Sequence, residues 1–147
     1  MKKLFRFVFL LFILTFYCTP SQAEPELANL TIQFTGMTPH VGQIIYIRVI
    51  DKGTMKESGR IWEHITVANF DITLDAVTAG RSYIIDFFAD HNNNTFYDPP
   101  PTDHAWRLEL NNAAGNDVVA FAHNTNFTDI DWEYLLLVQF TGMTPHI

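Results

Sequence analysis

Apolar and polar residues alternate along most of the chain, and this alternation limits the fold more than any other feature of the sequence. Leu30, Ile32 and Phe34 alternate with polar residues, so this segment predicts a strand with one apolar face. The pattern recurs in six further segments: 43–51, 69–76, 81–90, 105–110, 117–123 and, more weakly, 61–67. Turn residues such as Pro39 and Gly80 separate the segments. About seven short strands at this spacing predict an all-β fold, an antiparallel β-sandwich.

The segment QFTGMTPH occurs twice, at 33–40 and again at 139–146, which is 106 positions later. The apolar positions that precede it recur too, with Leu136, Val138 and Phe140 in place of Leu30, Ile32 and Phe34. The second copy is therefore interpreted as a second first strand, one sandwich domain further along the chain. Residues 134–147 then form a separate unit, either the start of another repeat or a donor strand.

Three explanations of this repeat stay open. The chain is the first unit of a tandem array, as in stalk-like surface proteins. Alternatively, the terminal strand takes the place of the first strand in a neighbouring subunit, and head-to-tail exchange of this kind builds a filament. In the third explanation residues 134–147 add an eighth strand to the same monomer. The first two predict self-association or contact with neighbouring repeat domains.

The first 23 residues have the pattern of a secretory signal peptide. They begin with basic residues, continue with an apolar run from Leu4 to Tyr17, and end in small residues before a cleavage point after Ala23. We therefore expect a secreted protein, extracellular or at the cell surface, without membrane attachment after cleavage. Cys18 is the single cysteine and lies in this segment, so the mature chain offers neither disulfides nor thiolate ligands. Residues 24–133 are predicted to be the sandwich domain.

The charge of the mature chain limits its partners. The signal segment holds three of the nine basic residues and none of the sixteen acidic ones, which leaves 6 against 16 and a net charge of −10. Such a surface disfavours nucleic acid as a partner, keeps an exported protein soluble, and offers carboxylates to cations.

An acidic, asparagine-rich loop follows the segment at 81–90. Its side chains have the spacing of a calcium loop, in which alternate residues turn oxygens inward and position 7 offers its carbonyl. The predicted calcium ligands are Asp90, Asn92, Asn94, Phe96 (by its carbonyl), Asp98 and Asp103. Thr95 replaces the usual glycine and Pro101 the usual glutamate, so Asp103 is expected to supply the missing carboxylate. The alternative is a polar hairpin tip whose side chains bond their own backbone.

The stretch from Arg81 to Trp106 resembles a segment of bacterial secreted β-sandwich domains of the transthyretin-like or immunoglobulin-like kind. In those domains a strand with a preceding glycine and a tyrosine leads into an Asp-x-Asn-x-Asn-x-x-x-Asp loop. The matching residues are Gly80, Tyr83, Asp90, Asn92, Asn94 and Asp98. The resemblance covers about a fifth of the mature chain, and it implies a surface or structural role, in some cases as repeats.

The histidines carry no catalytic signature in the sequence. His64, His91, His104 and His123 are available acids or bases, but no nucleophile elbow, phosphate loop or zinc-helix motif accompanies them. Asp103 adjoins His104, yet neighbours on a strand point to opposite faces. We therefore expect no enzyme.

The repeated turn contains two residues that suit copper, Met37 and His40. One thioether and one imidazole are too few ligands for a site. Met37 is therefore expected to close the end of the core instead.

Flat aromatic side chains suggest an alternative function, carbohydrate binding, because such faces stack on sugar rings. The candidates are Tyr97, Trp62 and Trp132, whereas Trp106 alternates in phase with Leu108 and is expected in the core. The main prediction is a secreted structural or adhesive module, stabilised by calcium, that assembles through repeats or strand exchange. Polysaccharide is the partner in the alternative.

Overall fold

A computed structural model describes residues 26–132, which form seven strands and one short 3-10 helix. The elements are β1 (Ala28–Thr35), η1 (Thr38–His40), β2 (Ile44–Asp51), β3 (Lys56–His64), β4 (Phe70–Val77), β5 (Tyr83–Ala89), β6 (His104–Leu110) and β7 (Asp117–Ala122). Within these residues no helix has the length and apolarity that crossing a bilayer requires.

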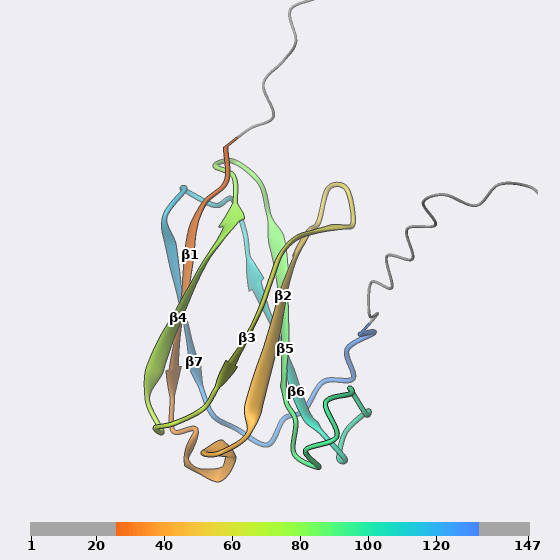
Figure 1. Ribbon diagram of the computed structural model, residues 1–147. Coiled ribbons are helices and arrows are strands. Elements are labelled where there is room, and N and C mark those ends of the chain that lie inside the picture. The colour runs from red at the N-terminus through yellow and green to blue at the C-terminus, as the bar shows by residue number, and fades with distance from the viewer. Residues whose placement is uncertain (1–25, 133–147) are drawn as a thin grey trace, which may run out of the picture.

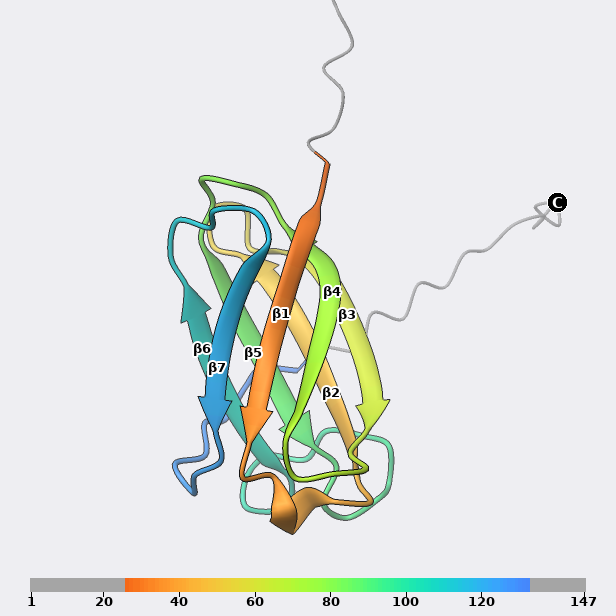
Figure 2. The ribbon, with the colours of Figure 1, turned by 90° about the vertical axis from the view of Figure 1, so that its left-hand side faces the viewer.

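The strands form two sheets that face each other, in the orders β4-β1-β7 and β3-β2-β5-β6 (Figure 1). The predicted β-sandwich is therefore confirmed. One pair departs from the antiparallel pattern: β1 and β7 run side by side in the same direction, as Figure 2 shows. Because β1 and β7 are parallel, both strands end at the same end of the sandwich.

The core lies between the two sheets and consists of the alternating apolar residues. Leu30, Ile32 and Phe34 of β1 are at most 1% exposed, and they face Ile47 and Phe87 from the other sheet in one cluster. Phe34 contacts the Phe87 ring edge-on, with 5.3 Å between the centroids. β1 is hydrogen-bonded on both sides, to β4 and to β7, so it is the central strand of its sheet.

β3 differs from its prediction. The sequence predicts a weak strand at 61–67, whereas β3 begins at Lys56 and ends at His64. β3 is an edge strand, and its first half is polar and partly exposed. The alternation of apolar residues is therefore absent there, and only the pairing with β2 reveals the strand.

Residues 127–132 run past β6 and over the outer face of the four-stranded sheet, as Figure 1 shows. There Ile130 and Trp132 pack with Phe88 in a second, small apolar cluster. The Trp132 ring also lies under two guanidinium groups, with 5.1 Å from its centroid to Cζ of Arg48 and 4.7 Å to Cζ of Arg60. The segment therefore covers the sheet from outside.

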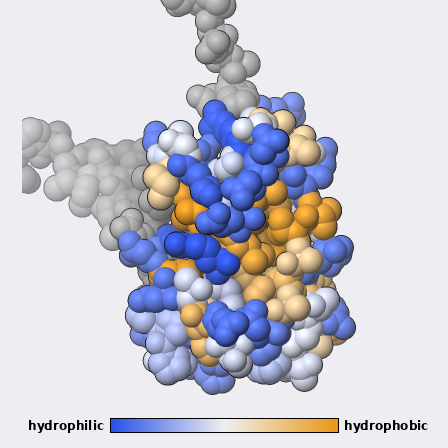
Figure 3. Space-filling model, turned by 180° about the vertical axis from the view of Figure 1, so that it is seen from behind, coloured by the Kyte–Doolittle hydropathy of each residue, from blue (hydrophilic) through white to orange (hydrophobic). Residues whose placement is uncertain are grey.

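The side of the sandwich between the edge strands β6 and β7 is apolar in its middle. Figure 3, which shows the molecule from behind, displays this patch between polar surroundings. Leu108 and Leu110 of β6 and Val119 of β7 are only partly buried. The sheets thus do not close completely along this side.

Candidate histidine metal site

Four histidines lie at one end of the sandwich because four chain segments begin or end there. His123 directly follows β7, His91 comes two residues after β5, and His104 is the first residue of β6. His40 is the last residue of η1, which follows β1. Because these segments meet at one end of the sandwich, histidines as many as 83 positions apart in the sequence lie close together.

Local residues determine the conformation of the turn that contains His40. Gly36 has a φ of 72°, which a glycine adopts without strain, and its amide donates to Asn69 Oδ1 at 2.9 Å. Met37 is 0% exposed and belongs to the main core, as the sequence predicts. Pro39 suits the first turn of η1 because its missing N–H costs nothing there. The His40 ring is thereby buried against the other histidines.

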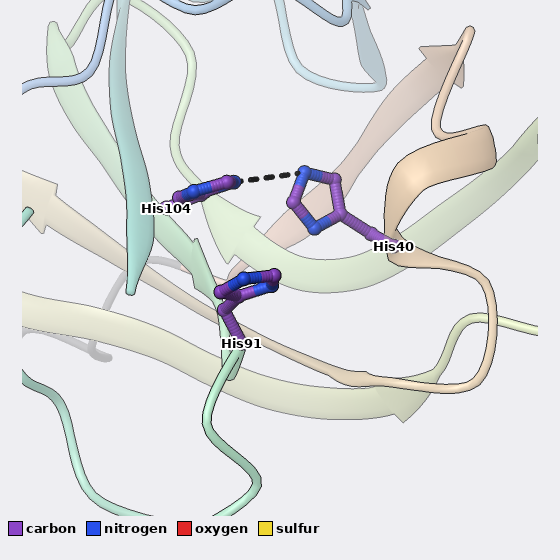
Figure 4. A group of neighbouring side chains, drawn as sticks. All are labelled: His40, His91 and His104. Carbon is purple, nitrogen blue, oxygen red and sulfur yellow. Dashed lines mark hydrogen bonds between the residues drawn. The ribbon is translucent and has the colours of Figure 1, made fainter. Parts of the chain in front are cut away.

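The imidazole nitrogens of these histidines converge. His40, His91 and His104 each offer one ring nitrogen within 4.8 Å of the others (Figure 4). His40 Nε2 lies 3.4 Å from His104 Nδ1 and 3.2 Å from His123 Nε2. A group of imidazole nitrogens at these distances is a candidate site for a metal ion.

Gln43, which directly precedes β2, connects two of the rings. Its side-chain oxygen lies 2.8 Å from His40 Nδ1, and its side-chain nitrogen lies 3.0 Å from His91 Nδ1. Ring nitrogens of metal-binding histidines that do not face the metal usually have such a hydrogen-bond partner. Gln43 therefore orients both rings.

Aromatic side chains surround the cluster. The His104 ring stacks on Phe127 with 4.1 Å between centroids, and the His40 ring meets Trp106 edge-on at 5.5 Å. Trp106 is 2% exposed, as predicted for a core residue, and its Nε1 donates to the Asn124 carbonyl at 3.1 Å. This bond holds the chain just beyond His123 against the core.

The surroundings favour the neutral form of two of the rings. Burial, together with the neighbouring imidazoles, lowers the pKa of His104 to about 4. Burial also lowers the pKa of His40, although the hydrogen bond with Gln43 opposes this effect. Neutral imidazole is the form that binds metal ions, and the lowered pKa values favour this form in His40 and His104.

The asparagine-rich loop lies beside the cluster and is closed by its own hydrogen bonds. Asp90 is 1% exposed and accepts from the amides of Asn94 and Thr95. The Asp98 carboxylate accepts from the side chains of Asn92 and Asn94, at 2.8 Å each. These contacts hold four of the predicted calcium ligands, Asp90, Asn92, Asn94 and Asp98, in one hydrogen-bonded loop.

Asp103 joins the same loop. It is 0% exposed and accepts from the backbone amides of His91 and Asp98, and burial raises its pKa. His104, in contrast, is the first residue of β6 and belongs to the histidine cluster. The Phe96 side chain is 62% exposed. Calcium binding to this loop stays a prediction.

The aromatic residues considered for sugar stacking do not form one surface. Trp62 on β3 is 59% exposed. Tyr97 packs against Phe88, and its hydroxyl donates to Asp129 and accepts from the Ile130 amide. Trp132 is 7% exposed. Of the three, Trp62 alone presents a largely open ring.

The structure describes only some of the residues predicted for assembly. Leu30, Ile32 and Phe34 lie in the core on β1. Leu136, Val138 and Phe140 lie outside the described residues, as do the predicted signal peptide and the repeated segment at 134–147.

Sequence reasoning missed the histidine cluster. The sequence analysis considered His40 only as a copper ligand together with Met37. It considered His91, His104 and His123 only as catalytic acids or bases. One signal was present: each of these histidines lies near one end of an alternating segment. Comparison of the chain with protein-family models, with curated proteins and with solved structures finds no match.

Proposed function

We propose that the protein is an exported module that binds one transition-metal ion, Zn²⁺ or Cu²⁺, through the histidine cluster of His40, His91, His104 and His123. One observation carries the proposal: three of these histidines, from three separate chain segments, each offer a ring nitrogen within 4.8 Å of the others.

The chemistry of the donors selects the class of ion. Imidazole suits zinc, copper and nickel, whereas calcium and magnesium require oxygen ligands. Copper binds most tightly among divalent ions of the first row, so availability decides between copper and zinc. A chain whose single cysteine lies in the predicted signal peptide also binds metal without thiols that an oxidising compartment would convert to disulfides.

The site also has the supports that a metal centre needs. Gln43 holds the outer nitrogens of two rings, and Phe127 and Trp106 fix the ring planes by stacking and edge contacts. Such outer contacts reduce the conformational freedom that metal binding would otherwise remove. His40 is 0% exposed, so one ligand is already dehydrated.

Metal titration of the chelator-stripped protein tests the proposal. We expect calorimetry to give one equivalent of Zn²⁺ or Cu²⁺ per chain and the melting temperature to rise with the ion. A His40→Gln variant should lose this binding. The matched control is His64→Gln, which makes the same change at an exposed histidine on β3 outside the cluster.

His40 is buried, so its variant could lose binding by unfolding. Circular dichroism of each variant without metal separates the two causes, and a His104→Gln variant at a partly exposed ligand provides a second test. If the folded wild-type protein binds neither ion, or if His64→Gln weakens binding as much as the cluster variants, the proposal is wrong.

The structural role expected from the sequence is a second candidate. It is favoured by the content of the repeat: the copied octapeptide includes Phe34, Met37 and His40, three residues that are at most 1% exposed. An array of such domains would form a stalk at the cell surface. The metal ion would then stabilise each domain of the array.

A further inference from the structure

We propose that residues 134–140 of this chain dock on the free edge of β3 as an added strand. One face of that strand would fill the groove between β3 and β4, and the other would lie against Trp62. The segment lies outside the described residues, so its place is inferred from the course of the chain up to Trp132, from the groove and from the sequence. Neither a metal ion nor the four clustered histidines take part.

The described chain crosses the outer face of the four-stranded sheet toward β3. Phe127 stacks on His104 of β6, and Trp132 meets Phe88 of β5 edge-on, with 4.9 Å between centroids. The Trp132 ring also lies 4.7 Å from Cζ of Arg60 on β3. The residues after Trp132 therefore start beside β3, whereas β6, the opposite edge of this sheet, is three strand spacings or about 14 Å from β3.

A groove lies between the edge strands β3 and β4. At Gly59 of β3 these strands touch, because a Cβ there would lie 2.7 Å from Cβ of Ala76 on β4. Toward the end of β3 they leave a groove of about 290 Å³, with Ile61, Phe70 and Ile72 among its lining residues. Pockets for small-molecule ligands usually measure about 300–1,000 Å³. The groove therefore suits a few apolar side chains of a protein segment.

The segment at 134–140, YLLLVQF, would be apolar on both faces of a strand. It is the second copy of the β1 sequence, but in β1 the polar residues Asn29 and Thr31 alternate with the core residues. Their counterparts in the copy, 106 positions later, are Leu135 and Leu137. Strands with such continuous apolar runs are typical of positions that are covered on both faces. The copy is thus suited to a place with apolar neighbours on both sides.

The free edge of β3 offers such neighbours. The groove lies on the inner side, and Trp62, which is 59% exposed, lies on the outer side, because its cross-strand partner Tyr46 packs against the outer cluster. β3 pairs with β2, and within residues 26–132 no strand pairs with its other side. The backbone groups of such an edge can bind a further strand. Docking would direct Leu136, Val138 and Phe140 into the groove and Leu135 and Leu137 toward Trp62.

Amide hydrogen exchange of the mature chain, followed by NMR, tests the docking. We expect amides on the free edge of β3 to exchange at least about tenfold faster in Val138→Asp than in wild type, since burial of the valine opposes local opening. Val118→Asp makes the same change at a valine of β7 that is 61% exposed. This control should leave the β3 exchange rates within about threefold of wild type. If Val138→Asp leaves β3 as protected as in wild type, the proposal is wrong.

A double variant, Leu135→Asn with Leu137→Thr, tests the contact on the outer face. It gives the segment the residues that β1 has at the corresponding positions. Docking beside Trp62 predicts that exchange at the β3 edge again becomes at least about tenfold faster. A segment that merely takes the place of β1 in another subunit would tolerate both changes. Unchanged exchange rates in the double variant would therefore overturn the proposed contact.

Nuclear Overhauser contacts in the wild-type protein identify the occupant without any substitution, so the test does not depend on the folding of a variant. We expect contacts between the Trp62 ring and leucine methyl groups of residues 134–140. In a mixture of isotope-labelled and unlabelled chains, these contacts should arise within one chain. Contacts that arise only between chains would show that a second copy occupies the edge, and an absence of contacts would show that the segment does not dock there. Either result overturns the proposal.

Discussion

Asp86 of β5 and Arg48 of β2 lie directly opposite each other on neighbouring strands, and their carboxylate and guanidinium are 2.9 Å apart. Asp86 is 0% exposed and also accepts from Arg107 of β6 at 2.6 Å. Arg48 in turn donates to the carbonyl of Asp131, in the segment that covers this face. One buried carboxylate thus links three strands and the covering segment.

We expect Asp86→Ala to lower the free energy of unfolding by about 3–5 kcal/mol, because a buried arginine loses its partner. Urea denaturation measures the change. Asp71→Ala, at an exposed position of β4, is the control and should stay within about 0.5 kcal/mol of wild type. An Asp86→Ala effect below about 1 kcal/mol would show that the ion pairs contribute little.

Gly36→Ala tests the turn before η1. A Cβ at Gly36 would meet only ordinary contacts, the nearest being His123 Cβ at 3.6 Å, so the cost comes from the φ of 72°. We expect a loss of about 1–2 kcal/mol in the free energy of unfolding. Gly36→Asn should cost less, since asparagine tolerates this conformation. Equal costs for alanine and asparagine would point to crowding instead.

The metal-free protein should lose stability as the pH falls from about 6.5 toward 4. The folded protein lowers the pKa of His104 to about 4, mainly by burial, whereas the unfolded chain has the ordinary value of 6.5. Below pH 6.5 the unfolded state therefore takes up the proton first, and the contribution of neutral His104 is fully present only above that pH. Urea denaturation at several pH values measures the slope, which should become shallower in His104→Gln. An unchanged slope in this variant contradicts the prediction.

Calcium should raise the melting temperature of the chelator-treated protein if the loop from Asp90 to Asp98 binds it. A ligand that binds only the folded state at 100 times its Kd adds about 2.7 kcal/mol. Asp98→Asn should reduce the increase, because it removes a carboxylate that now accepts from two asparagines. If millimolar calcium leaves the melting temperature unchanged, the loop is a hairpin tip that bonds its own backbone.

Light scattering of the mature chain and of a version that ends at Glu133 tests the repeated segment. We expect both to be monomeric, because β1 already fills its place between β4 and β7 and an incoming copy would have to displace it. If only the longer form assembles, strand exchange is the function of the repeat.

Most of the fold was predictable because each strand carries its own pattern of side chains. Leu30, Ile32 and Phe34 identify β1 without knowledge of its neighbours. β3 was harder, since its residues at an exposed edge need not alternate. The parallel pairing of β1 with β7 was not predictable, because it joins residues such as Phe34 and Phe121 that local sequence does not relate.

The histidine cluster depends on this non-local information. Alternation shows that His104 and His123 lie near strand ends, but only the strand order shows that these ends meet. Gln43 could not be assigned a role either, since it acts on two rings 48 and 3 positions away. The predicted calcium ligands, in contrast, lie in one loop and could be proposed from spacing alone.

The position of His40 has a consequence for the copying of this domain. His40 lies inside the octapeptide that recurs, and His91, His104 and His123 lie between the two copies. One period of 106 residues therefore encodes one complete set of four histidines. If the cluster binds one ion as proposed, each duplication of that period would add one ion to the capacity of the chain, and the amount of metal carried would scale with the number of domains.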